Sequence, residues 1–269
     1  QAEDGIRDFC LSRGLGDVYK RQVNHMIRGE EAKKDAEFVE DLCKKLGLSF
    51  FLFEEDVPYF AKKMGLSEEQ AGRYVRYRAF EEVLKKVGGD KIAVAHNKND
   101  AAETVLLNII RGTGLKGLVG IKPVNGNIIR PLIEIERREI EEYLESKNLK
   151  PRIDRTNYAP LYARNKVRLE VIPYIEELFG IDLVKNLSRM AAILLEEDDY
   201  LDSQCEEIFN QMCEVSEEEV RVELGAFRKL HLALKRRLIK RMYFQLKGNE
   251  EGLEYGHVED VLSLLDKPT

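Results

Sequence analysis

Polar residues separate a short apolar run from an amphipathic stretch near the middle of the chain. Residues 92–95 are all apolar and predict a strand, which stops at a polar loop over 96–100. From residue 101 onward the apolar positions step by three and four, which predicts a helix that ends at Gly112. Ligands in open α/β sheets bind at the carboxyl ends of strands, so the loop 96–100 is the first place to look for a site.

The same alternation of strand and helix patterns extends to both sides of this stretch. Ser67 followed by Gln70 has the spacing of a capping box at the start of a helix. Further strands are predicted at 23–29 (the end of a strand with its turn), 48–53 and 128–132, and amphipathic helices at 32–46, 67–87 and 134–146. Such an order is typical of an α/β fold with a doubly wound, mostly parallel sheet.

The composition of the chain changes at about residue 181, after which the pattern is almost entirely helical. Helices are predicted at 183–212, 226–246 and 257–265, and a short strand at 220–224. We therefore expect an α/β domain at 23–180 and a smaller, mainly helical domain at 181–269, with a boundary near 179–182.

The first 22 residues fit poorly with the rest of the chain. They have no clear helical or strand period, and the run LSRGLGDVYKRQ looks like translated sequencing-adapter sequence. We expect residues 1–22 to be non-native and poorly ordered. The chain stops at Thr269 without a recognisable terminal feature, so we interpret it as a piece of a longer protein, cut at both ends.

The distribution of charge restricts the class of protein. A net charge of −6 argues against a general nucleic-acid binder, and no apolar run approaches the roughly 18 residues of a membrane span. Residues 148–168 nevertheless hold six basic residues against one acid, and a phosphate-rich partner would fit this patch. The alternative is a basic loop that balances acidic neighbours, such as the stretch 190–220, which has no Lys or Arg.

The cysteines show neither zinc-ligand spacing nor a CxxC pair. They are Cys10, Cys43, Cys205 and Cys213. The last two fall in one helical pattern, where packing in a core is the usual role. We therefore expect reduced thiols, a cytoplasmic protein and no set of metal-ligating side chains.

Asp100 and Glu103 are the first candidates for chemistry in the central stretch. Residues three apart lie on one face of a helix, so the two carboxylates can converge. The same spacing is also that of a capping box in which Asp100 caps the first turn, and this alternative is favoured for the stretch taken alone. His96 is either an acid–base group or an ordinary hydrogen-bonded histidine.

Five segments with compatible spacing point to one family. They are HMIRGEEAKKDAEFV, EEQAGRYVRYRAFEEV, AHNKNDAAETVLLNIIRGTGLKGL, IIRPLIEIERREIEEYL, and DRTN followed by RNKVR. Together they resemble the tRNA(Ile)-lysidine synthetases, which are PP-loop ATP pyrophosphatases, over residues 23–266. The resemblance implies an ATP-dependent carbon–nitrogen ligase. In such a ligase the wobble cytidine of a CAU-anticodon tRNA(Ile) is adenylated at its C2 oxygen, and L-lysine then displaces AMP to give lysidine.

The resemblance also implies roles for individual residues. Asp100 and Glu103, with His96 beside them, match the family's acidic pair for lysine recognition and catalysis. The residues that match the family's nucleotide-facing positions are Arg73, Arg76, Tyr77 and His25, and those that match basic positions for phosphate or RNA are Arg111, Arg130, Arg164 and Arg168. ATP and Mg²⁺ are the implied cofactors, and a second copy of the chain is an implied partner.

Two departures from the family pattern concern the site. Asn97 and Asn99 stand where the family usually has a second His and a second Asp, so Asn97 is not expected to act as a base. The Ser-Gly-Gly-x-Asp-Ser run, which supplies backbone N–H groups to phosphates and a Mg²⁺ ligand, is absent from the sequence. We expect weak ATP binding and no ligase activity from this chain. The alternatives are another PP-loop tRNA-modifying enzyme, such as a thiolase, and a non-catalytic tRNA-binding module.

Overall fold

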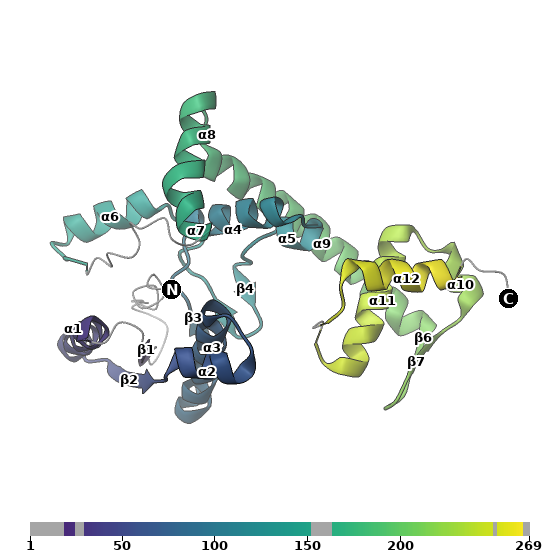
Figure 1. The fold of residues 1–269 in the computed structure, drawn as a ribbon, viewed down its shortest axis with the longest axis horizontal. Helices are drawn as coiled ribbons and strands as arrows, with labels where there is room; N and C mark the ends of the chain where they lie inside the picture. Colours follow the sequence, from purple (N-terminus) through teal and green to yellow (C-terminus); the bar gives the residue numbers. More distant parts are fainter. Residues whose placement is uncertain (1–18, 25–29, 152–162, 250–251, 266–269) are drawn as a thin grey trace. The chain divides into compact units, whose positions relative to one another are not determined.

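The computed structural model describes residues 19–24, 30–151, 163–249 and 252–265. The chain divides into two compact units, Gln1–Ala191 and Ala192–Thr269 (Figure 1). In these described parts, no helix is long and apolar enough to cross a membrane.

The strands of the first unit are short and mostly parallel. They are β1 (Tyr19–Asn24), β2 (Ser49–Glu54), β3 (Ile92–Ala93), β4 (Val124–Asn125) and β5 (Ile128–Ile129). β1 pairs in parallel with β2, and β3 pairs in parallel with β5, whose other edge takes the antiparallel β4. The predicted α/β class with mostly parallel pairing is confirmed, although the described strands form two small sheets in this unit and not one continuous sheet.

The strand β1 begins earlier than the sequence pattern predicted. Residues 19–22 are paired with β2, so the expectation that everything up to Gln22 is poorly ordered is wrong for these four positions. Residues 1–18 lie outside the described residues. The side chains of Lys20 and Gln22 are each only 4% exposed. Buried parallel strands normally carry apolar residues, so these two polar side chains are unusual occupants of the strand.

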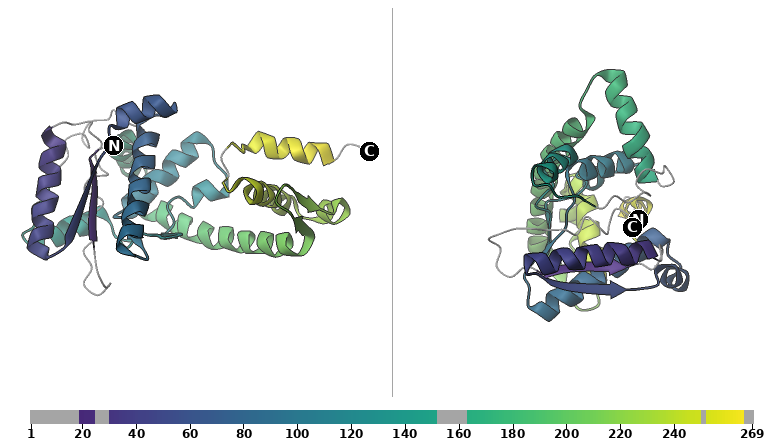
Figure 2. Two further views of the ribbon diagram at one scale, coloured as in Figure 1. Left: turned by 90° about the horizontal axis from the view of Figure 1, so that it is seen from below. Right: turned by 90° about the vertical axis from the view of Figure 1, so that its left-hand side faces the viewer.

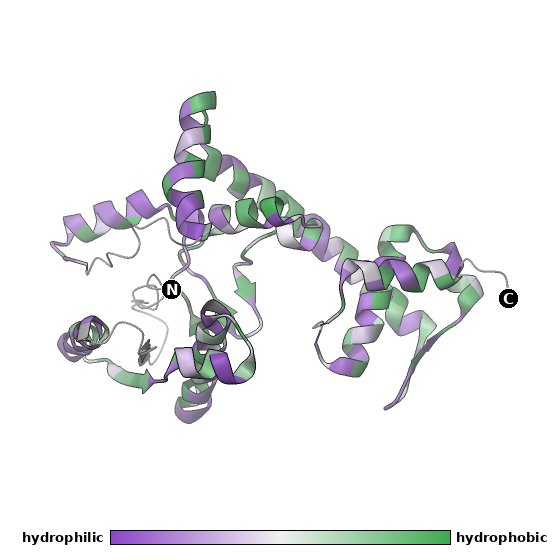
Figure 3. Ribbon diagram, viewed as in Figure 1, coloured by the Kyte–Doolittle hydropathy of each residue, from purple (hydrophilic) through white to green (hydrophobic). Residues whose placement is uncertain are grey.

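The predicted helices of the first unit are all present, and the structure adds short helices that the sequence pattern did not indicate. The helices of this unit are α1 (Glu30–Leu46), α2 (Val57–Met64), α3 (Glu68–Val87), α4 (Lys98–Arg111), α5 (Leu115–Leu118), α6 (Arg137–Ser146), α7 (Ala163–Lys166), the π-helical segment η3 (Val167–Val171), α8 (Ile172–Phe179) and the beginning of α9 (Leu183–Met212). The predicted capping box of α3 is present, with Gln70 N–H donating to Ser67 Oγ. α6 has no buried residue, and its ribbon is mostly hydrophilic in Figure 3.

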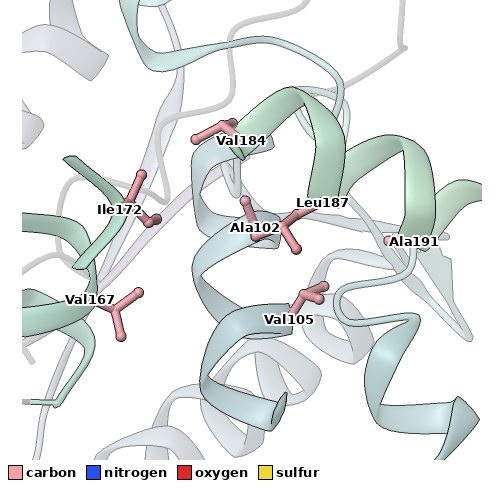
Figure 4. Close-up of a cluster of buried hydrophobic side chains, with 7 residues drawn as sticks. All are labelled: Ala102, Val105, Val167, Ile172, Val184, Leu187 and Ala191. Carbon is pink, nitrogen blue, oxygen red and sulfur yellow. The ribbon is translucent and has the colours of Figure 1, made fainter. Parts of the chain in front are cut away.

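Two apolar clusters hold this unit together. α1 runs along the β1–β2 pair (Figure 2). The first cluster joins Val23 of β1 to buried positions of α2 and α3. The second cluster joins Ala102 and Val105 of α4 to Val167, Ile172, Val184, Leu187 and Ala191 (Figure 4). Because the first turns of α9 supply part of this core, the first unit extends to Ala191 and not to the expected boundary near residue 180.

The second unit is mainly helical, as the sequence pattern predicted. It comprises the rest of α9, the antiparallel hairpin of β6 (Cys213–Val215) and β7 (Val220–Val222), α10 (Leu224–Lys229), α11 (Leu232–Lys247) and α12 (Tyr255–Leu265). Its core includes Cys205, Phe209, Phe227 and Leu238. The prediction of a single helix over 226–246 is wrong. The backbone is extended at Leu230 and His231, and the His231 ring accepts from Ala233 N–H at 3.2 Å to start a new helix.

Acidic residues of α9 pair with basic residues of α11 in this unit. Arg237 donates to the fully buried Asp198 at 2.8 Å and to Asp202. One turn further along, Arg241 donates to Glu206 at 2.6 Å. The acidic run that stands out in the sequence therefore has a structural use, because part of it neutralises the basic face of α11.

Candidate functional site

The corner between β3 and α4 is fixed by backbone bonds and by a capping box. Val94 N–H donates to Ile129 C=O at 2.9 Å, which extends the strand pairing up to the corner. Asn97 is the N-cap of α4: its side chain accepts from Asp100 N–H, and Asp100 Oδ2 accepts from Asn97 N–H, both at 3.0 Å. The predicted capping box of Asp100 with Glu103 is therefore wrong: the box is formed by Asn97 as the cap and Asp100 as the third helical residue.

Asp100 and Glu103 converge on two arginines from a distant part of the chain, and we call these four side chains the ion cluster. Arg168 Nε donates to Glu103 Oε1 at 2.6 Å, and its Nη2 donates to Glu103 Oε2 at 2.7 Å and to Asp100 Oδ1 at 3.3 Å. This is the two-pronged geometry that makes an arginine–carboxylate pair both strong and specific.

Arg164 contacts the same carboxylates from the side. Its Nε donates to Glu103 Oε2 at 2.9 Å, and its Nη2 donates to the backbone C=O of Asp100 at 3.2 Å. The same Nη2 lies 3.6 Å from Asp100 Oδ1. Three oxygens, two from carboxylates and one from the backbone, therefore surround this guanidinium group.

The members of the ion cluster differ in how far they are removed from solvent. The side chains of Asp100 and Glu103 are 0% and 1% exposed, whereas those of Arg168 and Arg164 are 11% and 29% exposed. Burial lowers the pKa of Arg168 to about 10, which still leaves it ionised at neutral pH. Two carboxylates and two guanidinium groups sum to no net charge, so each buried acid has a compensating cation.

Local helix geometry sets the arginines opposite the acids. Arg164 and Arg168 are four residues apart on the continuous α7–η3 stretch, and Asp100 and Glu103 are three apart on α4, so each pair lies on one helix face. Ile172 N–H donates to Val167 C=O, five residues earlier, which is the hydrogen-bond spacing of a π-helix. Pro173, which follows, has no N–H to donate within the helix.

His96 and Arg130 form a second buried pair at the strand ends. They are 9% and 7% exposed, and Arg130 Nε donates to His96 Nδ1 at 3.3 Å. Arg130 is held by a further bond from Nη1 to the C=O of Lys122 at 2.6 Å. Because Nδ1 accepts a hydrogen bond, the neutral ring carries its proton on Nε2. His96 is thus presented as a hydrogen-bond donor.

The two asparagines that depart from the family pattern have structural partners. Asn97 caps α4, and Asn99 Oδ1 accepts from Arg137 N–H, the first residue of α6, at 2.9 Å. Lys98, between them, pairs with Glu136 at 2.6 Å. The loop before α4 therefore also fixes the start of α6, a role that the sequence pattern did not indicate.

The remaining candidate residues do not belong to the ion cluster. Arg73 lies over the ring of Tyr77 on α3, with 4.8 Å from its guanidinium carbon to the ring centre, and Arg76 is half-buried on the same helix. Arg111 is exposed in the last turn of α4. His25 lies outside the described residues. Of the four basic positions expected to meet phosphate or RNA, only Arg111 is exposed; Arg130, Arg164 and Arg168 make internal bonds.

The described residues contain no group of three or more His, Cys, Asp or Glu side chains with the arrangement of a metal centre. Asp100 and Glu103, the buried acids of the corner, already balance two arginines, so this pair is not arranged to hold a divalent ion.

Comparison with known proteins identifies the family. Residues 11–175 match the family model of the PP-loop domain, an ATP-binding family. The chain belongs to the PP-loop domain family. Membership implies use of ATP, and the resemblance expected from the five sequence segments is confirmed.

Two curated relatives show which members of the PP-loop family this chain resembles. The chain is 76% identical over 252 residues to the tRNA(Ile)-lysidine synthase of Caldanaerobacter subterraneus. The aligned region covers 94% of this chain and 54% of that protein. The chain is 42% identical over 254 residues to the tRNA(Ile)-lysidine synthase of Clostridium perfringens, with the same shares covered. The chain thus spans about half the length of these relatives.

A solved structure supports the fold. The U34-tRNA thiolase NcsA from Methanococcus maripaludis superposes with a TM-score of 0.52 at 18% sequence identity, over 67% of this chain and 62% of that one. At this level of identity the likeness concerns the α/β fold and not the reaction.

Proposed function

We propose that this chain is part of an ATP-dependent ligase that joins L-lysine to C2 of the wobble cytidine in CAU-anticodon tRNA(Ile). The observation that carries the proposal is the 76% identity, over 252 residues, to a tRNA(Ile)-lysidine synthase. The reaction proceeds in two steps. The C2 oxygen of the cytidine attacks the α-phosphate of ATP and releases pyrophosphate. The neutral ε-amine of lysine then attacks C2, and AMP leaves with that oxygen.

The ion cluster suits the amine side of this reaction. The lysine ε-ammonium ion needs oxygen acceptors to hold it and a group that takes its proton, because only the neutral amine attacks. Asp100 and Glu103 offer such oxygens on one face of α4. Because His96 carries its proton on Nε2, it is better suited to donate a hydrogen bond to a developing anion than to accept the proton of the amine.

The other candidate residues take separate roles in this proposal. Arg73, Arg76, Tyr77 and His25 are assigned to binding of the nucleotide, and the exposed Arg111 to binding of tRNA. Mg²⁺ and a second copy of the chain stay predictions from the family resemblance. The thiolase alternative is less favoured because burial raises the pKa of the Cys43 and Cys205 thiols, whereas a catalytic cysteine needs its thiolate form.

A chimera tests the proposal directly. Residues 23–265 of this chain replace the homologous region of the Caldanaerobacter relative, and the purified protein is given ATP, radiolabelled lysine and a tRNA(Ile) transcript. We expect lysine in the CAU transcript and none in a control whose wobble base is changed to uridine. Absence of labelled lysine from an otherwise folded chimera would reject the ligase. Tight binding of tRNA without any product would favour the binding module.

The isolated 269-residue chain should give no lysidine in the same assay. Its sequence has no Ser-Gly-Gly-x-Asp-Ser run to hold the phosphates of ATP. Product formation by the isolated chain would show that another loop performs this role.

A further inference from the structure

The helical hairpin of α2 and the first half of α3 lies at the carboxyl ends of β1 and β2. Val23, the fifth of the six residues of β1, shares an apolar cluster with Ala61 of α2 and Ala71 of α3. Phe53, the fifth of the six residues of β2, packs against the same cluster. Ligands of open α/β sheets bind at this edge of the strands, so the outer surface of the hairpin borders the place where a substrate is expected.

Basic residues are concentrated in this hairpin. Residues 57–78 contain five Lys and Arg residues against two acids, in a chain whose net charge is −6. Arg78 is engaged by Glu55 at 2.7 Å, whereas Lys62 and Lys63, in the last turn of α2, are both exposed. A local excess of exposed positive charge on an acidic protein favours a polyanionic partner.

An exposed aromatic ring stands beside these lysines. Tyr74 of α3 is stacked on Phe60 of α2, with 14° between the ring planes and 5.6 Å between the ring centres. Tyr74 is nevertheless 54% exposed. Because one face of the ring is turned to Phe60, the exposed area lies on the opposite face and the edge. A planar base can continue such a stack, since every nucleobase presents a π-face.

Helical spacing brings the lysines and a second ring next to this stack. Lys63 is three residues after Phe60 and four after Tyr59, so its side chain neighbours both rings on the surface of α2. Tyr59 is 66% exposed. In duplex RNA the bases are stacked on each other inside the helix, whereas unpaired bases are open to stacking on side chains. Exposed rings with adjacent cations therefore favour single-stranded over double-stranded RNA.

We propose that Tyr74 is a stacking platform for an unpaired base of the tRNA anticodon loop, with Tyr59 as a second ring and with Lys62 and Lys63 in contact with the phosphates of that loop. The inference rests on the proposed function, because the ligase acts on a nucleotide of the anticodon loop. Tyr77, one of the positions assigned to the nucleotide, follows Tyr74 by three residues on the same face of α3. The platform thus holds a neighbour of the wobble cytidine and leaves the cytidine itself able to reach the ATP.

The test is binding of a fluorescently labelled anticodon stem-loop of tRNA(Ile) to the full chain, measured by fluorescence anisotropy. Tyr74→Ala removes the ring, and we expect roughly tenfold weaker binding. Tyr74→Phe keeps the ring and should bind as the unchanged protein does, which separates stacking from a hydrogen bond of the hydroxyl group. A fully paired RNA duplex of the same length should bind more weakly and should not distinguish the Tyr74 variants.

The lysines are tested through the salt dependence of binding. Lys62→Gln combined with Lys63→Gln should weaken binding and reduce the slope of log K against log salt by roughly 1 to 1.5, the value for two phosphate contacts on a single strand. The matched control is Lys44→Gln combined with Lys45→Gln. These are also adjacent lysines in the last turn of a helix, but α1 ends just before β2 begins, so they lie at the amino end of that strand. The control should change neither the affinity nor the slope.

Three results overturn the proposal: no binding of the stem-loop by the unchanged chain, equal binding by Tyr74→Ala and the unchanged chain, or the same loss in the control as in the lysine pair of α2. Circular dichroism checks that each variant is folded. If Tyr74→Ala does not fold, Tyr59→Ala decides instead: a loss of a few fold supports the platform, and unchanged binding rejects it.

The ligase is assessed separately from the platform. Lysidine formation by the chimera, together with unaltered stem-loop binding by Tyr74→Ala, would keep the ligase and reject the platform. Binding of the stem-loop that depends on Tyr74, without product from the chimera, would keep the platform and reject the ligase.

Discussion

Replacing Arg168 by methionine should strongly destabilise the first unit. Methionine retains much of the apolar stem, so the change removes charge and hydrogen bonds more than volume. It leaves Glu103 and Asp100, 1% and 0% exposed, with Arg164 as the cation of the cluster that remains. The buried acids would then exceed the cations by one.

The size of the effect follows from this burial. Removing one partner of a buried ion pair costs about 3–5 kcal/mol, since the other charge stays in a poorly solvated place. Arg168 is 11% exposed and makes three bonds to the two acids at 2.6, 2.7 and 3.3 Å, which puts it near the buried limit. For a unit of this size the melting temperature should fall by roughly 6–20 °C.

Urea unfolding followed by circular dichroism measures the loss, and Arg138→Met is the matched control. Arg138 also donates from Nε to a glutamate, Glu142, at 2.8 Å, but it is 85% exposed, and we expect little change there. Arg168→Met combined with Glu103→Gln should lose less stability than Arg168→Met alone, because no charge is left in excess. Equal effects of Arg168→Met and Arg138→Met would refute the assignment of a buried, stabilising cluster.

Three further predictions concern other parts of the chain. Burial raises the pKa of Cys205 to about 11 from 9.0. At pH 8 iodoacetamide should therefore label Cys205 at least about a hundredfold more slowly in the folded than in the unfolded protein, and rapid labelling of the folded protein would contradict this. The contribution of the neutral thiol to stability should be lost as the pH rises from 9 through 11. Gln22→Leu should raise the free energy of unfolding by about 1–3 kcal/mol, because Gln22 Oε1 is buried with no hydrogen-bond partner among the described residues; an unchanged urea midpoint would count against it. Gly120→Ala should lower the free energy of unfolding by about 1–3 kcal/mol, since φ is +67° and an added Cβ would lie 2.7 Å from Val105 Cγ2. Gly126 has φ +58° but open space around it, so Gly126→Ala should show only the smaller effect of backbone strain.

Elements with strong local signals were predictable from the sequence. The capping box of Ser67 and Gln70 starts α3, and apolar positions at helical spacing predicted α9 over 183–212. Helix α2 was missed because its eight residues bury only Val57 and Ala61, too few to show a period. Its signals were Asp56, whose side chain caps the helix, and Pro58 in its first turn.

The partners of the candidate residues were beyond sequence reasoning. Helical spacing placed Asp100 and Glu103 on one face, and the structure confirms that they converge. Arg164 and Arg168 reach them across 61 to 68 positions of sequence, and spacing shows which face a side chain lies on but not what packs against that face. The same limit explains why the bond between Arg130 and His96 was not predicted.

Capping and cation binding were alternative roles for Asp100 in the sequence, but in the structure the two oxygens of its carboxylate perform one role each. Oδ2 accepts from Asn97 N–H at 3.0 Å and fixes the orientation of the group, and this leaves Oδ1 directed at Arg164 and Arg168. The cap thus sets the direction of the carboxylate oxygen that faces the cations. An Asn at position 100 would keep an acceptor for the cap but lose the negative charge, so the two roles are separable by substitution even though they share a residue. A structural role for Asp100 therefore does not weaken its candidacy as a substrate-binding acid; it explains why the acid has a defined geometry before any substrate arrives.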